Sequence, residues 1–311
     1  MPCLHCVSYR HSVFFIVVRT FSAEIFCYIE KKQYLCSVKG ILSNKRGVIF
    51  GALDSRSLAW ATALACLREG AQLVLTNSAA AIELGEISRL AAEHGLPLLP
   101  CDATREEDLE RLLTEAQDRL GGKIDFVLHA VAQSQNIRRH KSYEEVNYHY
   151  FEQTLDTSAL SLHKLLQSAL HLDALAEGAS VVTLTYLASE RAMAGYNDMA
   201  DAKAMLESVV RNFGLIYGER KGVRINAVSQ SPTPTKAGSE FADLQYFYRL
   251  TDELSPLGNA DADDLADLCV ALFSDFTRKL TMQTIYNDGG FGRTMLTNRF
   301  AETYRKGADE G

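Results

Sequence analysis

Short apolar runs alternate with amphipathic stretches along most of the chain. The runs are rich in Val, Ile and Leu and end at turn-forming residues, which predicts strands that are buried on both faces. The stretches between them repeat apolar residues every three or four positions, as amphipathic helices do. Strands are predicted at 47–52, 72–77, 96–101, 124–130, 179–186, 224–229 and 283–290, and helices at 57–70, 81–95, 105–122, 145–173, 196–218 and, in two pieces, 238–275.

This alternation predicts the fold class. Apolar strands that are separated by helices form a parallel sheet with helices on both faces. The sequence therefore predicts an α/β, doubly wound, Rossmann-type fold with seven strands. Neither a linker nor an internal repeat divides it, which indicates one domain over about 44–311. Ligands of such sheets bind beyond the carboxyl ends of the strands, so candidate site residues are sought there.

Residues 1–43 do not continue the pattern. The segment "HSVFFIVVRTF" holds six consecutive apolar residues, too few to cross a bilayer. Cys3 and Cys6 form a C-x-x-C pair, but no second pair follows at a spacing suited to zinc, so no metal site is predicted. We interpret residues 1–43 as a poorly ordered extension outside the core.

The composition of the 311 residues is that of an ordinary globular protein, with 47% hydrophobic and 23% charged residues. A formal net charge of −7 argues against a nucleic-acid partner, and no segment predicts a membrane span. Cys66, Cys101 and Cys269 stand in apolar contexts, which indicates buried thiols in a reducing compartment such as the cytoplasm.

The segment "GALDSRSLAW" follows the first predicted strand, where Rossmann-type folds bind the phosphates of dinucleotides. It lacks the G-x-G-x-x-G fingerprint, since only Gly51 is present. Gly51 nevertheless permits close backbone approach, Ser57 can cap the next helix, and the free N–H groups of that helix would face a pyrophosphate. A purely structural turn accounts for the segment equally well.

The ends of the next two strands say less about a nucleotide. Near Asn77 there is neither the acidic residue of many NAD enzymes nor an Arg for a 2′-phosphate, although Arg56 could bind one. The choice between NADH and NADPH is therefore weakly determined. Asp102 follows the third strand, where an adenine would lie in this topology, and it could also cap the helix that starts near Glu106.

The candidate catalytic residues lie in "YLASERAMAGYNDMADAK" (186–203). Tyr186 ends a strand at the functional edge of the sheet. Tyr196 and Lys203 are separated by about 700° along an ideal helix, so their side chains are predicted to share one face. In a nicotinamide-dependent reduction, a tyrosine hydroxyl can stabilise the oxygen on which charge develops, and a nearby ammonium can bind the ribose hydroxyls and favour the anionic tyrosine. Taken singly, each residue is as well explained by packing at the edge of the core.

The longer segment "LTYLASERAMAGYNDMADAKAMLES" closely resembles the signature of type I enoyl-acyl-carrier-protein reductases, a divergent branch of the short-chain dehydrogenases. That branch has Tyr, nine residues, Tyr, six residues and Lys, whereas ordinary short-chain dehydrogenases have three residues between Tyr and Lys. The resemblance runs from about Lys45 to Arg299. It implies a cytoplasmic homotetramer that reduces the trans-2 double bond of enoyl-acyl-carrier-protein thioesters with NADH, NADPH not being excluded. This is the last reductive step of the fatty-acid elongation cycle.

Residue roles are implied by this resemblance alone. Tyr196 would bond the thioester carbonyl oxygen and stabilise the enolate, Lys203 would hold the nicotinamide ribose, and Tyr186 would line the substrate pocket. The resemblance further implies cofactor contacts for Gly51, Ser57, Leu58, Asp102, Ala103, Val131 and Thr233, and a substrate contact for Ser134.

The sequence departs from the branch at two places. Ala132 stands where the branch often has Gly, and "QSPTPT" follows the sixth strand in place of Ala-Gly-Pro-Ile. Pro232 is kept, while Ser231 and Thr233 differ, which resembles the Bacteroidetes-type version. These differences concern the residues around the nicotinamide amide and leave the reaction class unchanged.

Two surface segments have possible roles. The resemblance implies a mobile substrate flap at about 235–255, whose aromatic residues could cover an acyl chain or simply pack as a helix. The basic run "NIRRHKS" (136–142) could steer an acidic acyl carrier protein, although an ordinary solvated loop is the favoured interpretation. His129 ends a strand and is interpreted as structural. The aromatic residues of the flap are Phe241, Tyr246, Phe247 and Tyr248.

Two other functions compete with the enoyl reductase. A carbonyl reductase of the same fold is disfavoured by the Tyr-to-Lys spacing and by the additional Tyr186. A non-catalytic dinucleotide-binding regulator is disfavoured by the intact pair of Tyr196 and Lys203.

Overall fold

The computed structural model describes residues 24–29, 32–37, 40–235 and 244–309. The chain forms two compact units, residues 1–41 and 42–311. In the first unit, β1 (Glu24–Ile29) and β2 (Lys32–Ser37) pair as an antiparallel hairpin that the sequence pattern does not predict. Cys3 and Cys6 lie outside the described residues. Most of the extension that is expected to be poorly ordered lies outside them as well.

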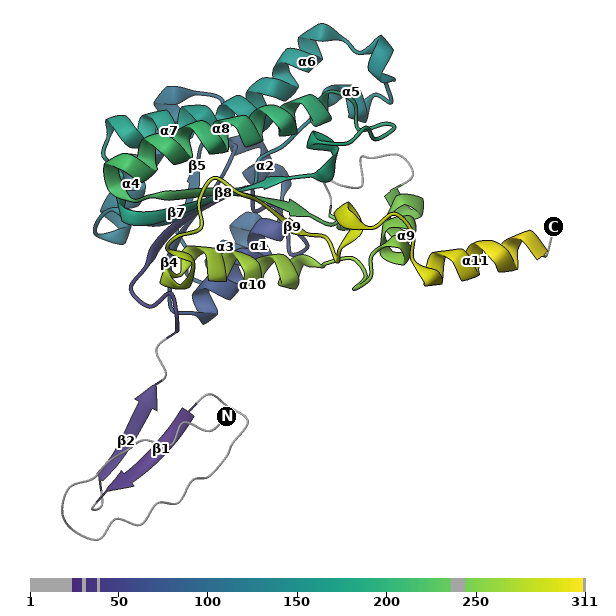
Figure 1. The fold of residues 1–311 in the computed structure, drawn as a ribbon. Helices are drawn as coiled ribbons and strands as arrows, with labels where there is room; N and C mark the ends of the chain where they lie inside the picture. The colour runs from purple at the N-terminus through teal and green to yellow at the C-terminus, as the bar shows by residue number, and fades with distance from the viewer. Residues whose placement is uncertain (1–23, 30–31, 38–39, 236–243, 310–311) are drawn as a thin grey trace. The chain divides into compact units, whose positions relative to one another are not determined.

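The second unit is built on a parallel sheet of seven strands, which confirms the predicted Rossmann-type fold (Figure 1). The strand order is β5-β4-β3-β6-β7-β8-β9, so the chain runs outward from β3 in one direction and then crosses over to β6 and continues in the other. This reversal is the switch point at which such sheets bind ligands. The strands are β3 (Arg46–Phe50), β4 (Gln72–Asn77), β5 (Leu98–Pro100), β6 (Ile124–His129), β7 (Leu175–Thr185), β8 (Arg224–Gln230) and β9 (Thr284–Asn287).

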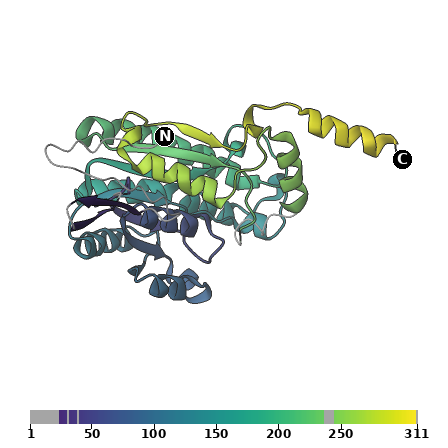
Figure 2. The same ribbon diagram turned by 90° about the horizontal axis from the view of Figure 1, so that it is seen from below.

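Helices cover both faces of the sheet, and each face has its own apolar core. One core lies under α1 (Leu58–Arg68), α3 (Ile87–Glu93) and α10 (Ala262–Phe273). The other lies under α4 (Glu106–Leu120), α7 (Ser161–His171) and α8 (Asn197–Lys221). The remaining helices are α2 (Ala79–Leu84), α5 (Gln135–Arg138), α6 (Tyr148–Leu155), α9 (Leu244–Leu254) and α11 (Asn298–Asp309). Of these, α5 and α11 were not predicted, and α11 leads away from the sheet beside α9 (Figures 1 and 2).

Two predicted helices are interrupted. The helix expected at 81–95 is split into α2 and α3 at Gly85, which has extended backbone and lies so close to Leu53 that a Cβ would meet its side chain at 2.7 Å. The helical region expected at 145–173 contains a π-helical turn at Asp156–Leu160. Within that wide turn, Ser158 Oγ accepts from Gln133 N (3.0 Å) and donates to Gln133 O (3.1 Å). The π turn therefore holds the loop that follows β6, and such turns are frequent at functional sites.

His129 is a buried side chain at the end of β6. Its ring nitrogens lie 3.0 Å from Thr183 Oγ1 and 2.9 Å from Ser161 Oγ. Burial lowers the pKa of His129 to about 3, with a further contribution from the charge of Lys203. The neutral ring therefore joins β6, β7 and α7, in agreement with a structural role.

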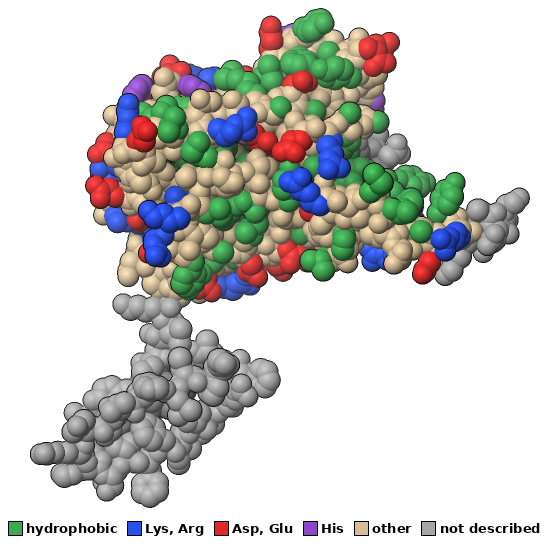
Figure 3. All heavy atoms as spheres, in the orientation of Figure 1, with side chains coloured by type: hydrophobic (Ala, Val, Ile, Leu, Met, Phe, Trp, Pro, Cys, Tyr) green, Lys and Arg blue, Asp and Glu red, His purple; other side chains and the backbone are tan. Residues whose placement is uncertain are grey.

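Charged side chains are interspersed by sign over the face of the second unit shown in Figure 3. Cys66, Cys101 and Cys269 are buried free thiols, as predicted. Among the residues with a described position, no helix is both long and apolar enough to cross a membrane. The same residues contain no cluster of His, Cys, Asp and Glu suited to a metal ion.

Candidate functional site

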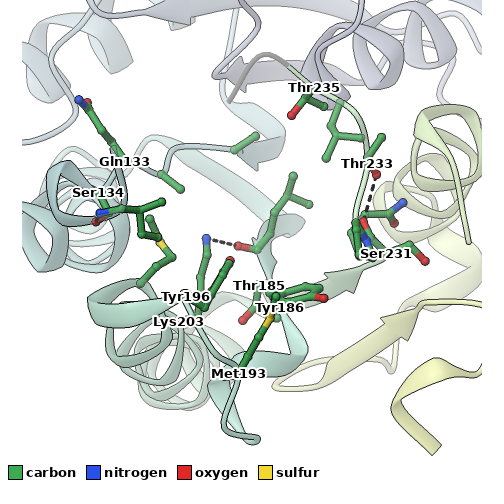
Figure 4. Close-up of a pocket in the computed structure, with 18 of the residues that line it drawn as sticks. Gln133, Ser134, Thr185, Tyr186, Met193, Tyr196, Lys203, Ser231, Thr233 and Thr235 are labelled. Carbon is green, nitrogen blue, oxygen red and sulfur yellow. Dashed lines mark hydrogen bonds between the residues drawn. The ribbon is translucent and has the colours of Figure 1, made fainter. Parts of the chain in front are cut away.

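A cavity of about 270 Å³ lies beyond the carboxyl ends of β6, β7 and β8 (Figure 4). Its wall is formed by the loops that follow these strands, by the first turns of α8, by part of α9 and by single residues of α1 and α5. Gly51, Ser57, Asp102 and Ala103 lie outside this wall, after β3 and β5. The predicted site residues that line the cavity are Leu58, Val131, Ser134, Tyr186, Tyr196, Lys203 and Thr233.

Gly51 allows the loops after β3 and β6 to touch. Its φ is +92°, and a Cβ at this position would lie 2.0 Å from the carbonyl oxygen of Ala130. The predicted close backbone approach is therefore present, and Ala130 is the residue that is approached. Only glycine satisfies both the left-handed backbone and the contact.

Replacing Gly51 by Ala is expected to lower the free energy of unfolding by more than about 1 kcal/mol, because strain at a positive φ is added to a backbone clash. Gly95→Ala is a matched control, since Gly95 has a φ of +64° but nothing within 4 Å of an added Cβ. Urea unfolding of both variants separates the two contributions. Equal losses in the two variants would show that the contact with Ala130 is unimportant.

Ser57 occupies the N-cap position of α1, but its side chain does not cap the helix. Its Oγ accepts from Leu53 N (3.2 Å) and donates to Asp54 O (2.7 Å), so the hydroxyl closes the preceding turn. The predicted side-chain cap is therefore wrong. Because no side-chain oxygen caps α1, its first N–H groups remain available to an anion.

Asp102 does not cap α4 either, because the N-cap residue of that helix is Arg105. Instead Asp102 Oδ1 accepts from Thr104 N (3.0 Å) and Thr104 Oγ1 (2.7 Å). The carboxylate thus stabilises the turn between β5 and α4, and its helix-capping role, expected from sequence, is wrong. The contact of Asp102 with an adenine stays a prediction.

Tyr186 and Tyr196 meet in the cavity, with ring centroids 5.2 Å apart and an interplanar angle of 46° (Figure 4). Tyr186 follows β7, and its hydroxyl oxygen is buried without a hydrogen-bond partner among the described residues. Burial raises the pKa of both phenols above the usual value near 10. Both are therefore protonated near neutral pH and can donate a hydrogen bond.

Lys203 is almost fully buried, with 5% of its surface exposed. Its Nζ donates to the carbonyl oxygen of Leu184 (2.8 Å), at the end of β7 (Figure 4). Burial lowers the pKa of Lys203 to about 8, and the charge of Glu207 opposes this shift. Near neutral pH Lys203 is therefore still an ammonium group, but it loses its proton at a lower pH than an ordinary lysine does.

Glu207 supports the site from behind the cavity wall, bonding Thr185 and acting on Lys203 through its charge, and it was not predicted from the sequence. It lies one turn after Lys203 and is 5% exposed. Its Oε1 accepts from Thr185 Oγ1 (2.7 Å) and from Ser189 Oγ (2.6 Å). Glu207 thus ties α8 to the end of β7 and the turn after it. An acid four residues after a candidate lysine, beside the buried stripe of a helix, is the signal that could have found it.

The start of α8 corrects the helix geometry expected from the sequence. Tyr196 is the N-cap residue, and Asn197 has a φ of +43°. Asn197 Nδ2 donates to the carbonyl oxygen of Lys141, which holds this left-handed residue. Regular helical spacing therefore applies only after Asn197. Tyr196 and Lys203 still line one cavity, but a tertiary contact contributes to that arrangement.

The loop after β8 contains Ser231 and Thr233, the residues at which the sequence departs from the usual pattern of the reductase branch. Ser231 Oγ accepts from Ala260 N (2.9 Å), while Ser231 N donates to Asn287 O (3.0 Å). Thr233 Oγ1 donates to Ser231 O (3.0 Å; Figure 4). The two hydroxyl residues thus fold the loop onto the end of β9, with Thr233 at the cavity wall.

The predicted flap contributes α9, and Phe247 of this helix reaches the cavity. Tyr246 is 69% exposed and lines an adjoining groove with Phe247. Phe241 lies outside the described residues. The described part of the flap therefore places one aromatic ring at the cavity and another at its approach.

A family model described as enoyl-(acyl carrier protein) reductase matches residues 51–292. The chain belongs to this family. Enoyl-acyl-carrier-protein reductase (NADH) 2 of Rhizobium meliloti is 34% identical over 262 residues, which cover 83% of this chain and 96% of the relative. The corresponding enzyme of Rickettsia bellii is 33% identical over 254 residues, covering 81% of this chain and 95% of the relative. The family resemblance seen in the sequence is confirmed.

Solved structures of the family share the fold. The FabI–NADH complex of Alistipes finegoldii has a TM-score of 0.84 and 49% identity, over 86% of this chain and 94% of that chain. The Bacillus cereus enzyme, solved with NADP⁺ and an indole naphthyridinone, has a TM-score of 0.77 and 30% identity, over 83% and 100%. The high identity to the Alistipes protein confirms the resemblance to the Bacteroidetes-type version.

Proposed function

We propose that this protein is an NADH-dependent enoyl-acyl-carrier-protein reductase that acts in the last reductive step of the fatty-acid elongation cycle. The observation that carries the proposal is the convergence of Tyr186, Tyr196 and Lys203 on one cavity at the switch edge of a Rossmann-type sheet. The Tyr186 hydroxyl, buried without a protein partner among the described residues, suits a polar group of a bound molecule.

The residues present fit a dinucleotide. Gly51 brings two loops into backbone contact, and the N-terminus of α1 offers uncapped N–H groups to a pyrophosphate. Lys203 would hold the nicotinamide ribose, and Val131 and Thr233 would flank the nicotinamide. The other proposed cofactor contacts are Ser57, Leu58, Asp102 and Ala103.

When bound, NADH supplies the hydride that adds to the β-carbon of the enoyl thioester. Negative charge then develops on the thioester oxygen, and Tyr196 donates a hydrogen bond to it. Uptake of one proton at the α-carbon completes the reduction. The raised pKa of Tyr196 keeps the phenol protonated until that charge appears. Tyr186 lines the substrate side of the cavity and assists acyl binding, and Ser134 lies near the substrate.

Lys203 supports this step in two ways. Its ammonium would bond the ribose of the bound cofactor, and its positive charge would stabilise negative charge that develops near Tyr196. Lys203 is almost fully buried, so both interactions are stronger than they would be in water. Glu207 opposes the loss of the Lys203 proton and so favours the charged form.

The partner is acyl carrier protein that carries the enoyl group, and the active form is a cytoplasmic homotetramer. Two features support an assembly. β9 is an edge strand of the sheet, and α11 leads away from the sheet, so both are available to a second copy of the chain. The run 136–142 is a candidate contact for the acidic carrier. Arg138, Arg139 and Lys141 are exposed there, and the Arg139 guanidinium lies over the ring of Tyr150, 5.0 Å from its centroid.

The test is oxidation of NADH and of NADPH, followed with crotonyl-CoA and with a longer enoyl thioester. Oxidation of NADH with either thioester is expected, with NADPH the weaker donor. A folded protein that oxidises neither cofactor would contradict the proposal. Oxidation with ketones but not with enoyl thioesters would favour the carbonyl reductase instead.

Deleting residues 1–40 is expected to leave this activity intact, because the catalytic residues all belong to the second unit. Leu42 is fully buried, and its N–H bonds Glu69 O (3.1 Å), so the cut must precede it. A deletion of residues 1–44 is the control and should lower the unfolding midpoint. Loss of activity in the shorter deletion would overturn the assignment of the extension as dispensable.

A further inference from the structure

A buried carboxylate in the first turn of α8 has no part in the chemistry proposed above. Asp198 is fully buried. Its Oδ1 accepts from Ser134 Oγ (2.7 Å), and its Oδ2 accepts from Asn136 Nδ2 (2.7 Å) and from Thr154 Oγ1 (2.8 Å). Among the described residues it forms no ion pair within 4.0 Å. Three neutral donors and the positive end of α8 therefore stabilise it.

The three donors belong to three parts of the cavity's surroundings. Ser134 begins α5, and its Oγ also accepts from Ile137 N (3.1 Å). The side chain of Asn136 makes two hydrogen bonds with the backbone of Asn147. Its Oδ1 accepts from Asn147 N (2.9 Å), and its Nδ2 donates to Asn147 O (3.2 Å). Thr154 lies on α6. Asp198 therefore joins the first turn of α8 to the loop after β6, to α5 and to α6.

Asp198 and its three donors lie next to the proposed catalytic tyrosine. Tyr196 precedes Asp198 by two residues, and the residue between them is the left-handed Asn197, which is bonded to the Lys141 carbonyl. Since Tyr196 is outside the regular helix, the α8 hydrogen bonds alone do not set its direction. The anchors on Asn197 and Asp198 hold the turn that carries Tyr196, together with the backbone bond from Tyr196 N to Met193 O (3.3 Å).

We propose that Asp198 is a positioning residue that holds the Tyr196 hydroxyl in register with the loop 130–134, which lines the opposite wall of the cavity. This inference rests on the proposed enoyl reductase function. One carboxylate bonds Ser134 on that loop and fixes the turn that carries Tyr196, so both walls of the cavity share a single anchor. A displacement of about 1 Å between reacting groups can cost about a hundredfold in rate.

Asp198→Asn is the first test, because it keeps the shape but replaces one acceptor oxygen by a donor. We expect kcat to fall about ten- to a hundredfold, with the KM for NADH changed less than threefold. Asp263→Asn is the matched control, since Asp263 is an exposed acid in the first turn of α10. It should leave kcat unchanged.

The deciding measurement is a double-mutant cycle with Tyr196→Phe. If Asp198 acts by positioning the Tyr196 hydroxyl, Asp198→Asn should lower kcat little further once that hydroxyl is gone. Hydrogen–deuterium exchange gives a readout independent of turnover, with faster exchange expected over 196–201 in Asp198→Asn and no change in Asp263→Asn. Equal losses of kcat in both backgrounds, or unchanged exchange, would overturn the proposal.

Two outcomes need to be told apart. A wild-type protein that does not reduce enoyl thioesters contradicts the proposed function, whereas an active wild type with additive losses contradicts only the role of Asp198. If Asp198→Asn does not fold, Ser134→Ala and Thr154→Val each remove a single donor and replace it in the cycle. Additive losses with Tyr196→Phe in both of these variants would overturn the proposal equally.

Discussion

Replacing Tyr196 by Phe is expected to lower kcat for enoyl thioester reduction by about 10²–10⁴, the usual worth of a positioned proton donor. Phe keeps the ring contact with Tyr186 but removes the hydroxyl that would stabilise charge on the thioester oxygen. The affinity for NADH should change little, because the proposed partner of this hydroxyl is the substrate. Steady-state NADH oxidation and a binding titration measure the two quantities separately.

Tyr217→Phe is the control for this variant. Tyr217 lies on the same helix, and its buried hydroxyl donates to Leu166 O (2.8 Å), away from the cavity. Its loss should reduce the free energy of unfolding by about 1 kcal/mol and leave kcat unchanged. If Tyr196→Phe retained wild-type kcat, Tyr196 would not be the residue that stabilises the developing charge.

Replacing Lys203 by Met is expected to weaken NADH binding by about 10- to 100-fold, the range for a hydrogen bond to a charged group. Met keeps much of the buried aliphatic stem but removes the ammonium. The same change should stabilise the protein without ligand, because a buried charge is removed. Binding and unfolding measurements should therefore move in opposite directions, and unchanged NADH affinity would show that the assigned ribose contact is wrong.

Lys221→Met is the control. Lys221 lies at the far end of α8 and bonds Asp173 and the carbonyl oxygen of Leu175. Its replacement should lower the stability and leave NADH affinity unchanged. Comparison of the two variants separates the loss of a lysine on α8 from the loss of the charge at the cavity.

The pH dependence of Lys203 follows from its lowered pKa of about 8, against an ordinary value of 10.5. NADH affinity should fall as pH rises through about 8, because the ammonium loses its proton. Between about 8 and 10.5 the unfolded chain binds the proton more tightly than the folded one. This group therefore makes the free energy of unfolding rise with pH in that window, and Lys203→Met should remove both effects.

The sequence by itself determined the architecture and most of the proposed site. Periodicity is a local property, so the seven strands of the main sheet and most helices on both faces could be predicted. Helix ends, the breaks at Gly85 and at the π turn, and the helices α5 and α11 could not. The Tyr, Tyr and Lys pattern could be found as well, because it lies within one strand–helix unit. Strand polarity then required these residues to gather at one edge of the sheet.

Only the tertiary structure decided how that site is held. The donors to Asp198 come from residues 64, 62 and 44 positions away in the chain. Likewise, the left-handed Asn197 depends on a carbonyl 56 positions away. Ser57 and Asp102 stand where caps are expected, yet each bonds its own turn, because several acceptors compete for the same donors. Such partners have no periodicity along the chain, and therefore only the folded structure reveals them.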